Sequence, residues 1–503
     1  MTFWFFLVLG LLTYLLMQHS VARATRTPVW LLWLVLMTPA FISTAWTLIY
    51  GVKQAPPSAL IISVSVICLL LYWVLFNSGR QLPINRENQS QENQEQANNN
   101  YPNNYPNNYP NSTIEKPPVR PIDLAEEAQL RTCFPWSVYF IQKIEYRPQA
   151  IICRGQLRTM ASAAYAQIKA NIEKEFGDRF LVIFQEGMNG KPFFVLVPNS
   201  QAAKQNNQRD SENITQPGLA LVLLIATLVS TTFVGLKIAG FQVTQIESDF
   251  TLFFQGLPYA LGLMTILATH ELGHYLTARF YKIRATLPYF IPVPFFLGTF
   301  GAFITMRSPI PHRKALFDVS IAGPLAGFIV TIPLLIWGLA NSEIVDLPEK
   351  TGMLNPNALN PKYSILLALL SKLALGSELT VKSAIDLHPV AVAGFLGLIV
   401  TALNLMPVGQ LDGGHIVHAM FGQRTAVIIG QVARLSLLIL SLLREEFLLW
   451  AIILLFIPLT DEPALNDVTE LDNKRDFMGL MSMVLLLLIV LPLPQFLANL
   501  LQI

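Results

Sequence analysis

The amino-acid sequence predicts a polytopic α-helical membrane protein with a small cytosolic α+β domain. Of its 503 residues, 53% are hydrophobic and only 13% are charged, whereas soluble proteins carry about 25% charged residues. The apolar residues gather in long segments, most of them close to the ~20 residues that a helix needs to cross a bilayer. One stretch, residues 120–200, instead shows the short strands and single helix of a soluble fold.

Charge and cysteine usage exclude several classes of protein. A formal net charge of +2 gives no sign of a nucleic-acid-binding surface. The three cysteines, Cys68, Cys133 and Cys153, are widely spaced and form no CxxC motif, so no cysteine zinc site is predicted. Cys133 and Cys153 can in principle pair, but reduced thiols in a cytosolic domain are the preferred interpretation. The N-terminus lacks the basic region of a signal peptide, so residues 2–17 are interpreted as a retained anchor.

The N-terminal part divides into membrane helices and a linker. Residues 1–79 contain three apolar segments, at 2–17, 29–50 and 58–76, and each is predicted to cross the membrane. Residues 80–119 are rich in Asn, Gln and Pro and repeat Tyr-Pro-Asn-Asn, a composition that cannot bury a core. We expect a disordered linker there, with a partner-binding tail as the alternative.

Residues 120–200 are predicted to form a soluble accessory domain. The order of elements is strand, strand, helix, strand, strand, and Gly177 suits the end of the helix. The predicted elements are strands 139–146, 151–154, 180–184 and 192–197 and helix 161–176. No catalytic cluster lies in this domain, so a role in presenting substrate or restraining an enzyme is expected.

Residues 216–460 form the predicted transmembrane core, and residues 461–503 add a C-terminal transmembrane helix. Prolines interrupt the apolar residues 286–310, which favours a hairpin or re-entrant loop over a straight helix. Gly323 and Gly327 are attributed to close helix packing. The predicted spans are 218–238, 252–280, 316–339, 388–406, 426–443, 447–459 and 478–500, and a short interfacial helix is expected at 365–375.

An HExxH motif lies inside one of these predicted spans. His270 and His274 are four residues apart, which places both imidazoles on one face of a helix, close enough to bind one metal ion. Glu271 stands beside them, where it can take a proton from a metal-bound water. Because such residues are costly in a bilayer, the motif predicts a functional site rather than a chance match on a soluble helix.

A second motif follows the span that begins at His388. It reads NLMPVGQLDG from Asn404 to Gly413 and contains Asp412, the only acidic residue of the apolar run to Met420. Pro407 and the glycine pair Gly413-Gly414 are expected to break the helix and turn Asp412 toward the metal. The alternative is a helix-ending Asp-Gly turn in a cytosolic loop.

Basic residues predict the orientation of the chain. Arg23 and Arg26 follow the first span, which places the N-terminus outside and the α+β domain in the cytosol. The same count makes the HExxH span run inward, ending at Arg279 and Lys282, so the site lies toward the cytosolic side.

The remaining histidines receive weaker interpretations. His415 and His418 are possible extra ligands, but the start of a cytosol-facing helix is favoured for both. His312 is expected at the surface, His388 at the outer interface, and His19 is taken as incidental.

Together the two motifs resemble the site-2 protease family of intramembrane zinc metalloproteases, whose pattern is HExxH on one span and NxxPxxxLDG on another. The resemblance covers residues 218–459 and favours the cyanobacterial and chloroplast branch, although neither a PDZ nor a CBS domain is recognised. It implies Zn²⁺ bound by His270, His274 and Asp412, with Glu271 activating water. It also implies that Asn404 steadies the substrate or the oxyanion.

The resemblance further implies regulated intramembrane proteolysis of single-pass membrane proteins by a multi-pass protein of the plasma or thylakoid membrane. The lipid bilayer is its expected surroundings, nucleic acid is not an expected partner, and the oligomeric state stays open. Two other functions also remain: a metal carrier or sensor, which has no need of Glu271, and a catalytically silent scaffold.

Overall fold

The computed structural model describes most of the chain beyond residue 122. Described are residues 28–50, a few positions between 64 and 75, 122–187, 190–199, 216–241, 249–293, 297–347, 355–443 and 447–503. The chain forms two compact units, Met1–Ile114 and Glu115–Ile503. In the first unit, α2 (Val29–Tyr50) confirms the helix predicted at 29–50. The anchor at 2–17, most of the 58–76 segment, the 80–119 linker and His19 lie outside the described residues.

A four-stranded antiparallel sheet forms the predicted α+β domain. The strands are arranged in the order β1-β2-β4-β3, so β3 is an edge strand. The predicted sequence of elements is confirmed, and the core is aromatic: Tyr139, Phe184 and Phe194 are fully buried. The elements are β1 (Tyr139–Arg147), β2 (Ala150–Leu157), α6 (Ala161–Phe176), β3 (Phe180–Glu186) and β4 (Pro192–Pro198).

One helix of this domain was not predicted. Helix α5 (Leu124–Thr132) precedes β1 and begins with a capping box, in which Asp123 accepts from the Glu126 amide and Glu126 accepts from the Asp123 amide. A side-chain cap of this kind satisfies amides that the first helical turn leaves unpaired. The Asp-x-x-Glu spacing was therefore the available signal for this helix.

The part of unit Glu115–Ile503 that follows the α+β domain is mostly helical and apolar. Of the described residues, four helical segments are long and apolar enough to cross a membrane: Pro217–Ile238, Thr251–Phe280, Arg313–Ala340 and Gln423–Ser441. They comprise α8 (Pro217–Ile238), η3 (Phe250–Gly256) with α9 (Leu257–Phe280), α10 (Arg313–Ala340) and α14 (Gln423–Leu443). Helix α12 (Pro389–Leu405) is shorter but equally apolar.

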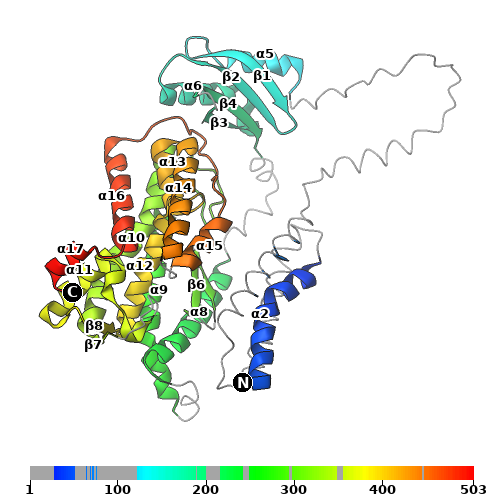
Figure 1. The fold of residues 1–503 in the computed structure, drawn as a ribbon. Helices are drawn as coiled ribbons and strands as arrows, with labels where there is room; N and C mark the ends of the chain where they lie inside the picture. The colour runs from blue at the N-terminus through cyan, green and yellow to red at the C-terminus, as the bar shows by residue number, and fades with distance from the viewer. Residues whose placement is uncertain are drawn as a thin grey trace, which may run out of the picture. The chain divides into compact units, whose positions relative to one another are not determined.

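Close packing holds α9, α10 and α12 side by side (Figure 1). A Cβ atom on Gly338 of α10 would lie 2.4 Å from the backbone nitrogen of Ala391 in α12. A Cβ atom on Gly394 would lie 2.8 Å from the Cα atom of Leu335. These helices therefore approach each other at a distance that only glycine permits.

The proline-rich segment after α9 forms the predicted hairpin. Strands β5 (Tyr289–Pro292) and β6 (Thr299–Phe303) pair antiparallel. The Ser230 hydroxyl of α8 donates to the Gly298 carbonyl at 2.6 Å, and the Tyr259 hydroxyl of α9 donates to the Leu297 carbonyl at 2.8 Å. The hairpin is thus fastened to the two helices that flank it.

Between α10 and α12 the chain makes a small substructure. Helix α11 (Ile365–Leu375) has the bounds predicted for it. Strands β7 (Glu343–Asp346) and β8 (Ser383–Asp386), which pair antiparallel, were not predicted. The remaining short helices of the described chain are η1 (Gly177–Arg179), η4 (Pro356–Ala358), η5 (Pro361–Tyr363) and η6 (Gly376–Glu378).

The C-terminal region corrects two predictions. The span predicted at 447–459 is a helix of nine residues, Leu448–Phe456, which is too short to cross a bilayer. In place of a single helix over 478–500, α16 (Asn473–Val490) and α17 (Gln495–Leu501) meet at an angle of 78°. Pro492 and Pro494 occupy the break, and proline lacks the amide that helix continuation requires. Before them come α13 (Asp412–Phe421) and α15 (Leu448–Phe456).

Candidate metal centre

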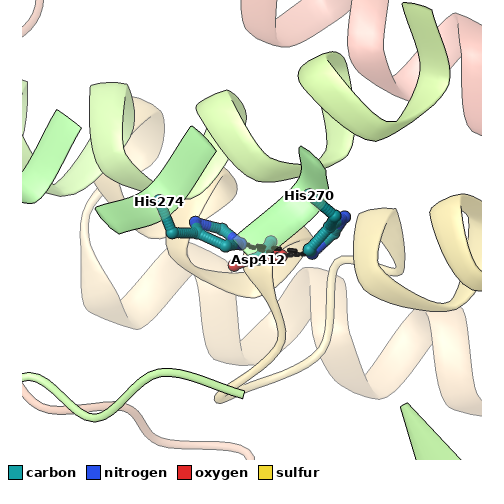
Figure 2. Close-up of side chains that lie close together, drawn as sticks. All are labelled: His270, His274 and Asp412. Carbon is teal, nitrogen blue, oxygen red and sulfur yellow. Dashed lines mark hydrogen bonds and ion pairs between the residues drawn. The ribbon is translucent and has the colours of Figure 1, made fainter. Parts of the chain in front are cut away.

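Helix α9 presents two histidines one turn apart. The Nε2 atoms of His270 and His274 lie 3.2 Å from each other. Both side chains are buried, at 4% and 7% exposure, between α9 and its neighbouring helices. Figure 2 shows the two rings directed toward Asp412, which comes from a different part of the chain.

Asp412 completes the group as the first residue of α13. Its Oδ2 atom lies 3.3 Å from Nε2 of His274 and 3.7 Å from Nε2 of His270. The three residues are the group of His, Cys, Asp or Glu that can hold a metal ion among the described residues. The structure therefore brings together the residues that two separate motifs contributed.

The spacing of these three atoms fits a zinc ion. Zinc–ligand distances of about 2.0–2.1 Å place the atoms of a tetrahedral site about 3.3 Å apart. The observed separations of 3.2, 3.3 and 3.7 Å lie close to that value. Two imidazoles and one carboxylate also leave one tetrahedral position open, as catalytic zinc sites do.

The loop that delivers Asp412 differs from the expectation. Helix α12 ends at Leu405 and Pro407 lies in the connection, but Gly413 and Gly414 belong to α13 and do not break it. Their lack of a side chain serves close contact instead. A Cβ atom on Gly413 would lie 2.0 Å from the Leu405 carbonyl oxygen, and one on Gly414 would lie 2.2 Å from the Gly409 carbonyl oxygen.

A backbone carbonyl orients one of the histidines. Nδ1 of His274 lies 2.8 Å from the carbonyl oxygen of Val319 in α10. Since a carbonyl only accepts, Nδ1 carries the proton and Nε2 directs its lone pair into the group. Outer contacts of this kind orient metal-binding histidines and raise their basicity.

Two glycines of α10 support the histidine rings. A Cβ atom on Gly323 would lie 2.1 Å from Nε2 of His274, and one on Gly327 would lie 3.2 Å from Cβ of His270. The interpretation of these glycines as plain helix packing was therefore incomplete, because they make room for the site itself. The matching four-residue spacings of the two glycines and the two histidines were the available signal.

Glu271 and Asn404 lie beside the group. Glu271 is 8% exposed and interacts with the backbone amide of Ile304, directly after β6. The amide nitrogen of Asn404 is 3.2 Å from Nε2 of His270. A buried carboxylate and an amide donor thus stand next to the position that three ligand atoms surround.

A second buried polar group lies further along α13. We call it the His418 cluster: His415, His418, Asp461, Asp467 and Arg313. Nδ1 of His418 lies 2.7 Å from Asp461, and its Nε2 lies 3.0 Å from Asp467. Both ring nitrogens thus face carboxylates, which only accept, so both N–H groups donate and the ring is an imidazolium.

The cluster corrects the interpretation of His418, which lies in a buried group rather than at a cytosol-facing helix start. His415 lies in the first turn of α13, and its side chain is 24% exposed. The His418 side chain is 0% exposed and that of Asp461 is 5% exposed. Burial lowers the pKa of His418, but its hydrogen bonds to Asp461 and Asp467 outweigh this effect and raise the pKa to about 9. Burial also raises the pKa of Asp461, while hydrogen bonds from His415 and His418 prevail and lower it to about 2.

Two further histidines cap helices. His312, expected at the surface, is half-buried, and its Nδ1 accepts from the Ala315 amide at the start of α10. His388 caps α12 by accepting from the Val390 amide. The cysteines Cys133 and Cys153 are free and buried.

Comparison with known proteins identifies two parts of the chain. Residues 258–443 match Peptidase family M50, and residues 128–205 match the EGY3 middle domain. The first match contains both histidines and Asp412, and the second contains the four-stranded sheet. The expected resemblance to the site-2 protease family, on its plant and chloroplast branch, is confirmed.

Three curated relatives extend the likeness over most of the chain. Probable zinc metalloprotease EGY1, chloroplastic, of Arabidopsis thaliana is 28% identical over 403 residues, which are 71% of this chain and 69% of that protein. Probable zinc metalloprotease EGY2, chloroplastic, of the same plant is 28% identical over 72% of this chain and 63% of its own length. Probable zinc metalloprotease EGY3, chloroplastic, of Oryza sativa subsp. japonica is 24% identical over 72% of this chain and 64% of its own length. The chain thus spans about two thirds of the length of these relatives.

Proposed function

We propose that this chain, which carries a peptidase family M50 domain of the site-2 protease type, is an intramembrane zinc metalloprotease. Its substrates are membrane proteins, cleaved in or near a transmembrane segment as a step of regulated intramembrane proteolysis. The observation that carries the proposal is the convergence of His270, His274 and Asp412 on one point inside an apolar helical core. Support comes from the M50 match and from relatives named as zinc metalloproteases.

The residues divide the chemistry among them. His270, His274 and Asp412 would hold the zinc, which would supply a Lewis acid for the scissile carbonyl and lower the pKa of a bound water. Glu271 accepts the proton of the attacking water and passes it to the leaving amine. The side-chain amide of Asn404 donates a hydrogen bond to the oxyanion that develops on the carbonyl. Val319 keeps His274 in the tautomer that binds the metal.

The hairpin supplies a place for the substrate backbone. A helical substrate hides its carbonyls, so a segment of it must unwind before the attack. Strand β6 pairs with β5 on one side, and Phe300 on it is 71% exposed. The contact between Glu271 and Ile304 places the end of this strand next to the catalytic base. Strand addition to β6 would therefore deliver an extended substrate to the zinc.

Proline substitutions test this substrate edge. We expect single Pro substitutions along residues 299–305 to slow cleavage while zinc stays bound, since each removes a backbone donor from the strand. Cleavage rate and zinc content of the same preparations are the measurements. Unchanged cleavage across the series contradicts strand addition.

The protein is proposed to be a multi-pass protein of the plasma or thylakoid membrane. The apolar helices support a membrane location, and the relatives are named chloroplastic. Arg279 lies in the last turn of α9 and Lys282 follows its end, which favours a site toward the cytosolic side. Single-pass membrane proteins are the proposed substrates, since one helix is the smallest unit that can enter such a site.

The function is tested with the purified chain in detergent, supplied with zinc and a tagged single-span substrate. Cleavage products are mapped by mass spectrometry for the wild type, for Glu271→Gln and for the exposed control Glu378→Gln. We expect cuts inside the span by the wild type and the control, and a loss of about 10²–10⁴-fold in Glu271→Gln. Zinc content stays the same in all three. Zinc binding without cleavage across a panel of substrates would instead favour a metal carrier or sensor.

A further inference from the structure

Helix α13 joins the metal centre to the His418 cluster. Asp412 is its first residue and His418 is six residues further on, so about 9 Å of helix separates them along the axis. The helix is short and continuous from Asp412 to Phe421. Whatever holds His418 therefore also sets the position of the Asp412 carboxylate.

Charge balance holds His418 firmly. The side chains of Asp461 and Asp467 are each 5% exposed, that of Arg313 is 6% exposed and that of His418 is 0% exposed. Arg313 pairs with Asp467 at 3.1 Å, so an imidazolium at His418 compensates the second carboxylate. Moving His418 away would leave Asp461 with only the partly exposed His415 and would take one hydrogen bond from Asp467, so both buried carboxylates would lose charge compensation, which is strongly unfavourable.

The two carboxylates belong to an irregular segment that follows α15. The part of it at residues 464–468, here the docking segment, runs beside the start of α10. The Leu465 amide donates to the Ile310 carbonyl at 2.9 Å, and the Asn466 amide donates to the Pro311 carbonyl at 3.0 Å. Asp467 of this segment bonds both Arg313 and His418.

The other side of the docking segment meets the α+β domain. The Phe184 amide of β3 donates to the Leu465 carbonyl at 2.7 Å, and the Asp467 amide donates to the Phe184 carbonyl at 2.8 Å. Val468 packs against the hydrophobic core of the domain. Since β3 is the edge strand of its sheet, the docking segment adds to it as a short further strand.

We propose that His418 is a positioning residue for the metal ligand Asp412, and that the α+β domain governs this position by binding the docking segment through β3. The inference rests on the proposed function, because it concerns the same metal centre. It assigns the domain a role: when β3 holds residues 465–467, Asp467 is set against His418 and α13 is set against α9. When the contact opens, Asp412 loses its fixed place beside His270 and His274.

The contact between the docking segment and the α+β domain is small enough to open and close. Two backbone hydrogen bonds and the packing of Val468 join the docking segment to the domain. Such a contact can open without unfolding the sheet, whose own strands are paired along their length. A substrate or partner that binds the domain can thereby alter the metal centre through one segment of chain.

Cobalt(II) in place of zinc reports the ligand geometry directly. Visible absorption spectra and Co²⁺ affinity are measured on the full chain in detergent for the wild type, Val468→Asp, the milder Val468→Ala, and His418→Gln. Phe140→Asp is the control, since Phe140 is exposed on β1 of the same domain and away from β3. Circular dichroism and gel filtration establish that each variant is folded.

The expected result separates the variants from the control. His418→Gln and Val468→Asp shift the Co²⁺ bands and weaken Co²⁺ binding by about 10–100-fold, as the loss of supporting contacts does. Val468→Ala gives a smaller change in the same direction, and Phe140→Asp gives none. A folded Val468→Asp protein with the wild-type spectrum and affinity overturns the role of the domain, and the same result for His418→Gln overturns the positioning role. If the wild type itself binds no Co²⁺, the metal centre fails and the proposed function fails with it.

Discussion

Two groups of histidine and carboxylate each take residues from the short helix α13, yet they are built differently. In the metal centre, His270, His274 and Asp412 turn three acceptor atoms toward one point, at separations of 3.2–3.7 Å. In the His418 cluster, each nitrogen of His418 meets a carboxylate, so donors and acceptors alternate. The first group is incomplete without a cation, whereas the second is complete as it stands.

The difference shows what defines a buried metal site. Both groups contain histidine and aspartate, and both are largely buried, so residue type and burial do not distinguish them. The direction of the lone pairs does. Converging lone pairs repel each other unless a cation lies between them, while an imidazolium between two carboxylates is already neutralised on both sides.

Outside the metal ligands and Glu271, the largest effect we expect comes from the two glycines that pack against the metal-binding histidines. Gly323→Ala places a Cβ atom 2.1 Å from Nε2 of His274, so the ring must move and metal affinity falls by about 10–100-fold. Gly327→Ala is milder, because its Cβ atom would lie 3.2 Å from His270. Zinc affinity measured by competition with a chelating dye tests this order.

Gly218→Ala is the matched control for both glycine variants, since no atom lies within 4 Å of a Cβ atom placed there. Equal affinities for Gly323→Ala and the control contradict the assignment of Gly323 to the support of His274.

The His418 cluster predicts an intermediate effect of pH on stability. The groups facing His418 are Asp461 and Asp467, with Arg313 and His415 behind them. Burial lowers the pKa of His418, but the two carboxylates outweigh it and raise the pKa from 6.5 to about 9. A raised pKa stabilises the fold fully below pH 6.5, and the stabilisation is lost as the pH rises through 9. We expect the free energy of unfolding to fall by up to about 1.4 kcal/mol per pH unit in this interval.

Denaturant titrations between pH 6 and 10 measure this decline. In His418→Gln this titrating group is absent, so the free energy of unfolding declines less over the same interval. A wild-type curve that declines no more steeply than that of His418→Gln contradicts the charged state assigned to His418.

The smallest effect is expected at His415. Its ring makes one hydrogen bond, at 2.8 Å to Asp461, and its side chain is 24% exposed, so water can replace the bond when it is lost. We expect His415→Gln to lower the free energy of unfolding by about 1 kcal/mol. His418→Gln lowers it more, because Asp461 and Asp467 then each lose a buried, charge-assisted hydrogen bond and keep only His415 and Arg313, respectively. Equal losses of unfolding free energy for the two variants would contradict the distinction between His415 and His418.

The sequence predicted the metal centre because its chemistry is local in two short motifs. Spacing along a helix places His270 and His274 on one face, and Asp412 is conspicuous as the one acid in an apolar run. The His418 cluster was missed because its partners are distant: Asp461 and Asp467 lie 43 and 49 residues from His418 in the chain. No periodicity links such positions, and only the fold brings them together.

For the fold as well, features set by local sequence patterns were predicted and features that depend on distant or interrupted segments were not. Apolar length and alternation predicted the core helices, the hairpin and the four-stranded sheet, since those patterns reflect burial on one face or all round. The helix predicted over 478–500 failed because mean hydropathy does not register the two prolines at 492 and 494, which end α16. The β7–β8 pair was not predicted because its strands are only four residues long and 36 residues of chain separate them.

Metal analysis of three proteins tests the central claim most directly. Zinc per chain is measured after saturation and dialysis for the wild type, for Asp412→Asn and for Asp461→Asn. We predict one zinc per chain in the wild type and in Asp461→Asn, where binding is weaker because His418 is held less firmly, and a loss of the bound zinc in Asp412→Asn, because of these two residues only Asp412 contributes to the converging group. Retention of zinc in Asp412→Asn, or its loss in Asp461→Asn alone, would contradict the assignment of the two clusters.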